Sequence, residues 1–288
     1  MTQPPDVTIV IPCYQQAHLL PDALRSARRQ APAKVEIIVV DDGSTQDVTA
    51  AVRAVAPEAI FIRQANQGLA GARNTGLAAG SASLVAFLDA DDRLLPGGLA
   101  AGMACLAEHP DCGFVFGGYT NVDATGRPCR PSVRPRPGPV PYGALLARNL
   151  VGMHGAVLYR RSAIVEAGGF DAALRSCEDH DLYLRMAWRH PVQAHMALVA
   201  EYRRHGGTLS GQSLDMIEAG LAVLRRQRPR LASRDLRRAY RAGLRFTIAK
   251  YGFQFARQVA ARVARGEFRL SAGEIGAFAR RVPRWLSP

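Results

Sequence analysis

The fold of this 288-residue chain is decided by Val35-Glu36-Ile37-Ile38-Val39-Val40-Asp41-Asp42-Gly43-Ser44. The apolar, largely β-branched run indicates a strand that is buried on both faces, which is typical of a parallel sheet. Two aspartates follow at the point where that strand ends. Because ligands bind outside the carboxyl ends of the strands in open α/β sheets, we expect Asp41 and Asp42 to lie in a binding site.

A second acidic cluster caps another strand about fifty residues later. Asp89-Ala90-Asp91-Asp92 follows the apolar run Leu84-Val85-Ala86-Phe87-Leu88. Acidic residues repel one another, and a strand end has no structural need of three. A divalent cation that lies between the carboxylates and a diphosphate explains such a cluster. The two strand ends therefore predict a metal-dependent enzyme that acts on a nucleotide-linked substrate.

Strand and helix patterns alternate around these clusters. This alternation predicts an α/β fold with a Rossmann-like, doubly wound and mostly parallel sheet. We expect a surface loop in the proline- and arginine-rich stretch 127–141. Strands are expected at 7–12, 35–40, 59–62, 84–88, 114–119 and 155–160, and helices at 19–29, 68–80 and 178–190.

Charge is distributed unevenly along the chain. Residues 1–215 hold 20 basic and 20 acidic side chains, whereas residues 216–288 hold 17 basic and 4 acidic ones, so the whole net charge of +13 lies in the last quarter. This asymmetry predicts a neutral catalytic domain over 1–215 and a basic, helical C-terminal region over 216–288. It argues against a uniformly basic nucleic-acid-binding fold, and nucleic acid is not an expected partner.

Several other classes of protein are disfavoured by features that the sequence lacks. No run of about 18 apolar residues predicts a transmembrane helix, and the N-terminus does not have the pattern of a secretory signal. The five cysteines form no C-x-x-C pair, which favours small core residues in a reducing cytoplasm over zinc or disulfides. A dehydrogenase is disfavoured because no G-x-G-x-x-G follows the first strand.

Five segments occur in order along the chain. They are Val10-Ile11-Pro12-Cys13-Tyr14, Val39-Val40-Asp41-Asp42-Gly43-Ser44-Thr45, Asn66-Gln67-Gly68-Leu69-Ala70-Gly71-Ala72-Arg73-Asn74, Phe87-Leu88-Asp89-Ala90-Asp91-Asp92 and Glu178-Asp179-His180-Asp181-Leu182. Together they resemble the motifs of family 2 glycosyltransferases, which have the GT-A fold, and the resemblance covers roughly residues 5–210. It implies an inverting transferase that uses a nucleotide-diphosphate sugar, Mn2+ or Mg2+, and a single displacement. The Q-x-x-R-W motif of processive members is absent at its usual place, which implies transfer of one sugar at a time.

The resemblance also assigns residues to the donor site. Asp41 or Asp42 would accept a hydrogen bond from the uracil N–H, which favours a UDP-sugar, and Arg73 would reach the base or the phosphates. The alternatives are an Asx-type turn at Asp42 and a surface arginine on a tightly packed helix. The residues expected to bind the nucleotide sugar are Pro12, Tyr14, Asp41, Asp42, Arg73, Asp89, Ala90 and Asp91, and those expected to bind the metal are Asp89, Asp91 and His205.

Asp89-Ala90-Asp91 is the D-x-D signature of this resemblance. Alternation along an extended chain would put Asp89 and Asp91 on the same side. One would then bind the metal, and the other would hold ribose or a metal-bound water. The alternative is a solvated acidic turn, and Asp92 could serve only to cap the next helix, expected to begin near Pro96.

Asp179 is the candidate general base. At 100° per residue it shares the inward face of its helix with Leu182, Tyr183 and Met186, while Glu178, Asp181 and Arg185 lie on the opposite, solvated side. An inward carboxylate at a helix start suits removal of the proton from an acceptor hydroxyl. Alternatively, Ser176-x-x-Asp179 forms a capping box, and the protein is a nucleotide-binding module without catalysis. His154 and Glu178 are expected on the acceptor side.

The basic C-terminal region contains long amphipathic helical stretches. We expect it to contact an anionic membrane surface from the cytoplasm, on the inner face of the membrane. The acceptor would then be a lipid-linked glycan or a surface-glycan precursor. The alternative is a helical cap with a solvated basic face.

Overall fold

The computed structural model describes residues 4–204, 213–266, 275, 276, 279 and 281. The chain falls into two compact units, of which the first comprises residues 1–142 and 150–205 and the second comprises residues 143–149 and 206–288. The expected boundary after residue 215 lies inside the helix α8 (Ser213–Arg225) of the second unit.

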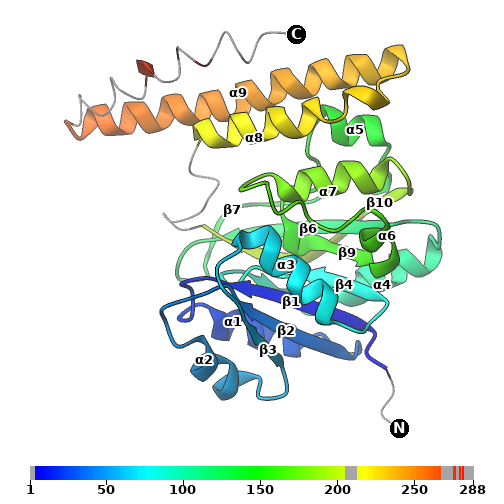
Figure 1. The fold of residues 1–288 in the computed structure, drawn as a ribbon, viewed down its shortest axis with the longest axis vertical. Helices are drawn as coiled ribbons and strands as arrows, with labels where there is room; N and C mark the ends of the chain where they lie inside the picture. Colours follow the sequence, from blue (N-terminus) through cyan, green and yellow to red (C-terminus); the bar gives the residue numbers. More distant parts are fainter. Residues whose placement is uncertain (1–3, 205–212, 267–274, 277–278, 280, 282–288) are drawn as a thin grey trace. The chain divides into compact units, whose positions relative to one another are not determined.

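A ten-stranded mixed sheet forms the first unit (Figure 1). Its strands are β1 (Val7–Cys13), β2 (Val35–Asp41), β3 (Ile60–Arg63), β4 (Leu84–Phe87), β5 (Arg93–Leu94), β6 (Phe114–Val122), β7 (Pro128–Val133), β8 (Gly138–Pro139), β9 (Val157–Arg160) and β10 (Val192–Arg203). The main path runs β3-β2-β1-β4-β9-β6-β10-β5, with β7 beside β6 and β8 beside β10. β3, β2, β1 and β4 are parallel to one another, and β9 is antiparallel to both of its neighbours.

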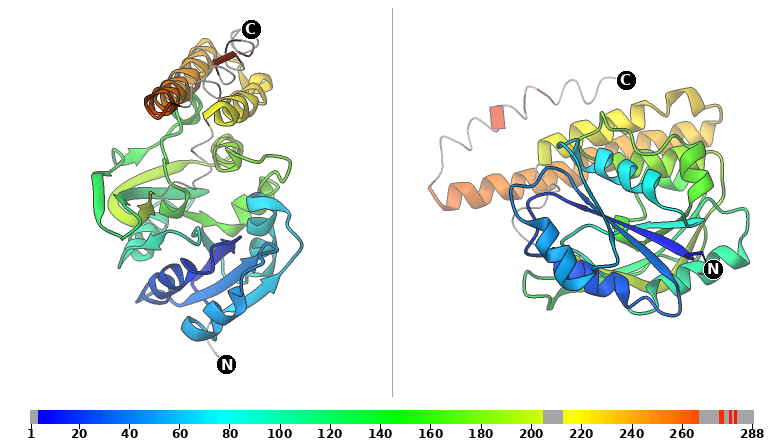
Figure 2. Two further views of the ribbon diagram at one scale, coloured as in Figure 1. Left: turned by 90° about the vertical axis from the view of Figure 1, so that its left-hand side faces the viewer. Right: turned by 60° about the horizontal axis from the view of Figure 1, so that its bottom comes forward.

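Helices cover both faces of the sheet. They are α1 (Leu20–Arg28), α2 (Val48–Val55), α3 (Gly68–Ala79), α4 (Gly98–Glu108), α6 (Arg161–Glu166) and α7 (Glu178–Ala187), and a further helix, α5 (Tyr142–Ala147), spans the junction of the two units. Ile9 and Ile11 of β1 share one core cluster with residues of α1 and α2. Val10 faces α3, where a Cβ added to Gly76 would lie 2.2 Å from Val10 Cγ1. Figure 2 shows the two layers of helices.

This arrangement explains the continuous apolar runs and confirms the expected doubly wound, mostly parallel sheet with C-terminal helices. The proline- and arginine-rich stretch is less irregular than expected, because β7 and β8 form within it. The side chains of β7 are exposed, so this stretch lies at the surface as the sequence indicated.

The strand ends that carry the acidic clusters meet at one edge of the sheet. β1 lies between β2 and β4, and Cys13 at its end pairs with Asp41. Backbone hydrogen bonds continue past the strands, from Asp42 N–H to the Cys13 carbonyl (2.9 Å) and from Leu88 N–H to the Val10 carbonyl (2.9 Å). The loops after β1, β2 and β4 therefore leave the sheet side by side.

The second unit is helical in the part that the structure describes. α8 packs along the 31-residue helix α9 (Arg234–Ala264) (Figures 1 and 2). Ile217 and Leu221 are buried between the two helices, against Leu244 and Ile248. Within the described residues, no helix combines the length and the hydropathy that a membrane crossing requires.

Candidate functional site

Asp41 has one carboxylate oxygen that the protein leaves without a hydrogen bond. The residue is fully buried, and its Oδ1 accepts from the Ser44 N–H (2.9 Å). Its Oδ2 is buried and has no hydrogen-bond partner among the described residues, with the Arg63 Nε 3.6 Å away. A buried acceptor without a donor is costly, so this oxygen is suited to a donor from a ligand.

In Asp42, by contrast, both carboxylate oxygens accept hydrogen bonds from the protein. Its Oδ1 accepts from Gln64 Nε2 (2.7 Å) and from the Gln67 N–H (2.8 Å), and its Oδ2 accepts from the Gly68 N–H (2.8 Å). The buried carboxylate therefore caps the N-terminus of α3, where a negative charge is favourable. Because the Ser44 N–H donates to Asp41, three residues earlier, the expected Asx-type turn at Asp42 is not formed. That Asp41 or Asp42 serves the base stays a prediction.

The loop after β1 is tied to the loop after β2. Pro12 is buried within β1, and Tyr14 is exposed just beyond it. Gln15 adopts a positive φ of 56°, and its N–H donates to Ser44 Oγ (3.0 Å). Tyr14 thus lies directly after the end of β1, where the sequence predicted a contact with the nucleotide sugar.

Arg73 lies inside the protein, between the two acidic motifs. The side chain is 2% exposed, its Nη2 donates to Asp89 Oδ1 (2.7 Å), and its Nη1 donates to Glu178 Oε1 (2.7 Å). Its guanidinium also lies 5.5 Å from the ring centroid of Phe170. Both Nη atoms of Arg73 are held by carboxylates in the interior. This position does not match the expected contact of Arg73 with the base or the phosphates. It does not match the alternative of a surface arginine either.

Charge is concentrated around this guanidinium. Burial alone would lower the pKa of Arg73, but Asp89 and Glu178, and more weakly Asp179, raise it, so the cation persists. Burial raises the pKa of Glu178, while Arg73 acts in the opposite direction. One guanidinium thus faces three carboxyl groups, those of Asp89, Glu178 and Asp179.

The D-x-D segment is a turn and not an extended strand. The Asp92 N–H donates to the Asp89 carbonyl (3.0 Å), so simple alternation does not relate Asp89 to Asp91. Asp89 turns toward Arg73 with its side chain 33% exposed, Ala90 is buried, and Asp91 is partly exposed. The turn is acidic, as the alternative proposed, but it is not merely solvated.

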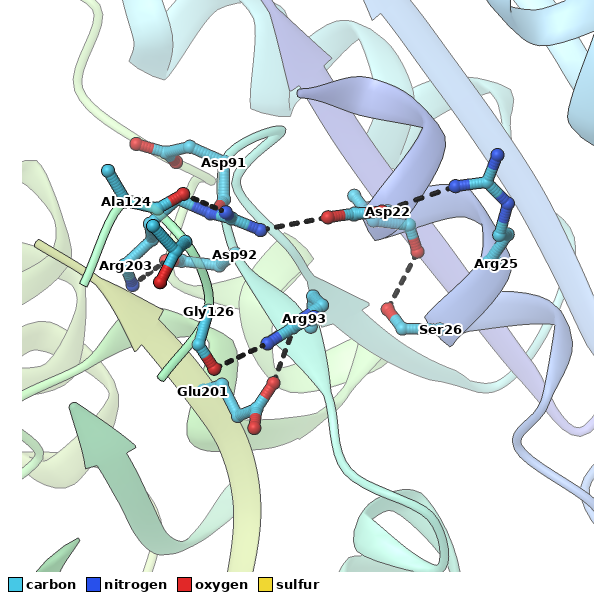
Figure 3. A network of polar contacts seen from close by, with 12 residues as sticks. Asp22, Arg25, Ser26, Asp91, Asp92, Arg93, Ala124, Gly126, Glu201 and Arg203 are labelled. Carbon is cyan, nitrogen blue, oxygen red and sulfur yellow. Dashed lines mark hydrogen bonds and ion pairs between the residues drawn. The ribbon is translucent and has the colours of Figure 1, made fainter. Parts of the chain in front are cut away.

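Asp92 serves a contact that the sequence did not suggest. Its buried Oδ1 accepts from the Arg203 N–H (2.8 Å), and the side chain of Arg203 reaches the Asp91 carbonyl (Figure 3). The next helix, α4, begins at Gly98 and has no side-chain cap, so the expected capping role of Asp92 is wrong. Burial, together with Asp91 and Asp89, raises the pKa of Asp92 well above its usual range.

Asp179 stands at the start of α7, next to the buried cluster. The helix begins at Glu178 after Cys177, which has φ 59° and does not cap it through its side chain, so the expected capping box of Ser176 and Asp179 is not formed. Asp179 Oδ1 accepts from the adjacent His180 N–H (2.7 Å), and the side chain is partly exposed. Its charge raises the pKa of Arg73 after the larger effects of burial, Asp89 and Glu178, so it belongs to the same electrostatic cluster.

The helical face drawn from sequence was wrong for two residues of α7. Glu178 is 6% exposed and Asp181 is 2% exposed, although both were expected in solvent. Each is buried because a cation meets it: Arg73 meets Glu178, and Arg185 Nε lies 2.7 Å from Asp181 Oδ2.

His154 lies in an aromatic cluster close to Arg73. Its Nδ1 is within 2.7 Å of Tyr183 Oη and 3.2 Å of Tyr159 Oη, and its ring packs against Phe87 and Phe170. Burial and then the charge of Arg73 hold the pKa of His154 well below its usual range, so the ring is neutral. Its buried Nε2 has no hydrogen-bond partner among the described residues. The acceptor-side role of His154 and Glu178 stays a prediction.

The donor set is compatible with a divalent cation that is shared with phosphates. His205 lies outside the described residues, and within them no group of three histidine, cysteine or acidic side chains is arranged to hold a metal by itself. Mg2+-type ions are commonly held by one or two carboxylates plus substrate phosphates. Asp89 and Asp91, both partly exposed at one turn, fit that pattern.

Asp41 and Asp42 should differ in their effect on stability. Asp42→Asn replaces an acceptor oxygen that α3 requires, so we expect a loss of about 1–3 kcal/mol in the free energy of unfolding. Asp41→Asn keeps an oxygen for Ser44 and weakens only the contact with Arg63, so we expect a loss of no more than about 1 kcal/mol. Urea unfolding measures both, and equal losses would contradict the two roles.

Comparison with known proteins shows the family of this chain. The model of "Glycosyl transferase family 2" matches residues 8–168, which is more than half of the chain. An uncharacterized glycosyltransferase of Haemophilus influenzae is 25% identical over 189 residues, covering 62% of this chain and 61% of the relative. The chain thus spans about three-fifths of that relative's length.

Two solved structures share the fold. TarS 1-349 from S. aureus, in complex with UDP-GlcNAc, superposes with a TM-score of 0.67 at 17% identity, covering 86% of this chain and 73% of TarS 1-349. The mannosyltransferase PcManGT from Pyrobaculum calidifontis, in complex with GDP-Man and Mn2+, gives a TM-score of 0.62 at 19% identity, covering 98% of this chain and 81% of its own. The GT-A fold that the motifs implied is confirmed, and the chain belongs to glycosyl transferase family 2.

Proposed function

We propose that this protein transfers a single sugar from a nucleotide-diphosphate sugar, a UDP-sugar, to a hydroxyl acceptor, with inversion and with Mn2+ or Mg2+ as cofactor. The observation that carries the proposal is the buried ion-pair cluster of the first unit. In it, Arg73 holds Asp89 of the D-x-D turn and Glu178, which directly precedes Asp179. Donor-side and acceptor-side carboxylates are thereby fixed relative to each other.

The nucleoside would bind at the ends of β1 and β2. Asp41 Oδ2, which accepts no hydrogen bond from the described residues, is an acceptor that would match the ring N–H of uracil. Cytosine has no N–H at the corresponding ring position, so an acceptor there favours uridine. Tyr14, which is exposed at the end of β1, would cover the base.

The diphosphate would lie over the D-x-D turn. Asp89 and Asp91 would hold a divalent cation together with phosphate oxygens, and the cation, when bound, neutralises the charge that develops on the leaving diphosphate. Arg73 would orient Asp89, because its hydrogen bond to Asp89 Oδ1 fixes that carboxylate. The second oxygen of Asp89 would then face the ligand.

Asp179 would act as the general base. It is partly exposed, whereas its neighbour Glu178 is buried and paired, so Asp179 is the member of the pair that an acceptor hydroxyl can reach. Proton removal as the hydroxyl attacks the anomeric carbon gives inversion in one displacement, and the proton goes to the Asp179 carboxylate.

Asp179→Asn should lower turnover by about 10²–10⁴-fold, since an amide cannot take up the proton. Binding of UDP in the presence of Mn2+ should stay close to that of the wild type. Initial rates of transfer or hydrolysis with a panel of UDP- and GDP-sugars, together with calorimetric binding of UDP, separate the two effects. Asp123→Asn, at an exposed turn of the same unit, is the matched control.

The competing hypothesis is a nucleotide-binding module without catalysis. It would be supported if the wild type bound UDP but neither transferred nor hydrolysed any sugar nucleotide in the panel. An Asp179→Asn variant with unchanged turnover would remove Asp179 from the mechanism.

We further propose that the second unit contacts an anionic membrane on its inner face and that the acceptor is a lipid-linked or surface-glycan precursor. α9 carries eight basic residues and one acidic residue. The exposed side chains of Arg238, Arg241 and Arg245 follow one another at helical spacing on one face. Phe253, about two turns beyond Arg245 on α9, is 69% exposed and offers an apolar group on the same helix. A basic helix with an exposed aromatic suits an anionic lipid surface.

Replacing Arg238, Arg241 and Arg245 together by Gln should weaken binding to vesicles that contain phosphatidylglycerol. At about 1 kcal/mol for each arginine, the loss is on the order of 100-fold. Sedimentation with anionic and neutral vesicles measures it. The control variant replaces Arg29, Arg53 and Arg175, which are exposed in the first unit. If the α9 variant and the wild type bind alike, or if neither binds, α9 is an ordinary helical cap with a solvated basic face.

A further inference from the structure

Arg203, at the end of β10, is the centre of a buried polar network (Figure 3). The residue is 5% exposed. Four of its N–H groups donate to four acceptors: the backbone N–H to Asp92 Oδ1 (2.8 Å), Nε to the Asp91 carbonyl (2.8 Å), Nη1 to the Ala124 carbonyl (2.9 Å) and Nη2 to Asp22 Oδ2 (3.0 Å).

Two of these contacts fix the backbone of the D-x-D turn. Arg203 holds the Asp91 carbonyl through Nε and the Asp92 carboxylate through its own backbone N–H. The Asp92 N–H is held from within the turn by the Asp89 carbonyl (3.0 Å). The peptide group between Asp91 and Asp92 is thus restrained on both sides, and Figure 3 shows the Asp91 carboxylate pointing away from the guanidinium. Arg203 therefore restrains the backbone from which that carboxylate projects.

The other two contacts anchor Arg203 itself. Asp22 lies in the first turn of α1, and Ala124 lies in the turn between β6 and β7. The guanidinium consequently joins three segments that are distant in the sequence. A buried guanidinium needs such partners, because an unpaired charge in the interior is strongly unfavourable. Lysine could not reproduce the contacts, because it lacks the planar fork of donors.

We propose that Arg203 is a positioning residue that directs the Asp91 carboxylate toward the cation bound to the donor diphosphate. This inference rests on the proposed function, because it presumes that Asp91 holds a cation. Residues that orient a metal ligand without touching the metal commonly change metal affinity by about 10- to 100-fold when they are replaced. Arg203 donates a hydrogen bond to the backbone of Asp91 and would orient a metal ligand in this indirect way.

A neighbouring arginine provides a matched control. Arg93 directly follows Asp92, and its Nε lies 2.6 Å from Glu201 Oε2 while its Nη2 donates to the Gly126 carbonyl (3.4 Å). Arg93 therefore holds the turn between β6 and β7, which Arg203 also contacts. The contacts of Arg93 that Figure 3 draws go to Glu201 and Gly126, and not to Asp91 or Asp92. A merely structural role of the arginines would affect both residues alike, whereas positioning of Asp91 concerns Arg203 alone.

The experiment measures Mn2+ binding to the full chain in the presence of UDP, from the electron paramagnetic resonance signal of free Mn2+, and UDP binding without metal by calorimetry. In Arg203→Met the dissociation constant for Mn2+ should rise by about 10- to 100-fold, whereas metal-free UDP binding should stay within about twofold of the wild type. Arg203→Lys should fall between the wild type and Arg203→Met, and Arg93→Met should bind Mn2+ as the wild type does.

A folded Arg203→Met protein with unchanged Mn2+ affinity would overturn the proposal, as would equal losses in Arg203→Met and Arg93→Met. If Arg203→Met does not fold, Arg203→Lys and Asp22→Asn decide the question, and wild-type Mn2+ affinity in both would overturn it. A wild type that binds no Mn2+ in the presence of UDP would overturn the proposed metal dependence together with the role of Arg203. A wild type that binds Mn2+ while Arg203→Met binds it equally well would overturn the role of Arg203 alone.

Discussion

The candidate site depends on one buried cation. The guanidinium of Arg73 lies between Asp89, at the end of β4, and Glu178, at the start of α7, with hydrogen bonds of 2.7 Å to each. Burying a charge is unfavourable unless it is paired and hydrogen-bonded. The carboxylates satisfy that requirement, and in doing so they hold two segments, separated by about ninety residues of sequence, on either side of the proposed reaction centre.

The local sequence around Arg73 follows from this requirement. α3 is built from small residues because it lies close against the sheet. At Gly76 a Cβ atom would collide with the side chain of Val10. Asp42 fixes the start of the same helix by accepting from the Gln67 and Gly68 N–H groups. One aspartate of the pair thus sets the position of α3, and through it of Arg73, while Asp41 has a buried oxygen with no hydrogen-bond partner among the described residues. The two adjacent aspartates have different tasks.

Much of the fold and the family could be predicted from sequence, because strand periodicity and strand-end motifs are local signals. The apolar runs at 35–40 and 84–88 gave the parallel strands, and the order of the five motifs gave the family. The division of labour between Asp41 and Asp42 could not be predicted, because it depends on which backbone N–H groups approach each carboxylate. The pairing of Arg73 with Glu178 spans 105 residues, and no local pattern encodes it. Helical periodicity alone did not predict the burial of Glu178 and Asp181, because each of these acidic side chains is paired with an arginine from a different position in the sequence. The role of Arg203 could not be predicted either, because its four acceptors come from segments that are distant in the sequence.

The most direct test of the central claim is a double-mutant cycle between Asp89 and Glu178, measured as the free energy of unfolding at a pH above neutrality. Asp89→Asn and Glu178→Gln each leave Arg73 with one charged partner, whereas the double variant leaves the buried guanidinium without either of the two. Because both side chains share Arg73, we predict that the double variant is less stable than the sum of the single losses by about 1–3 kcal/mol. Losses that add to within about 0.5 kcal/mol would show that the two carboxylates are independent and would contradict the account.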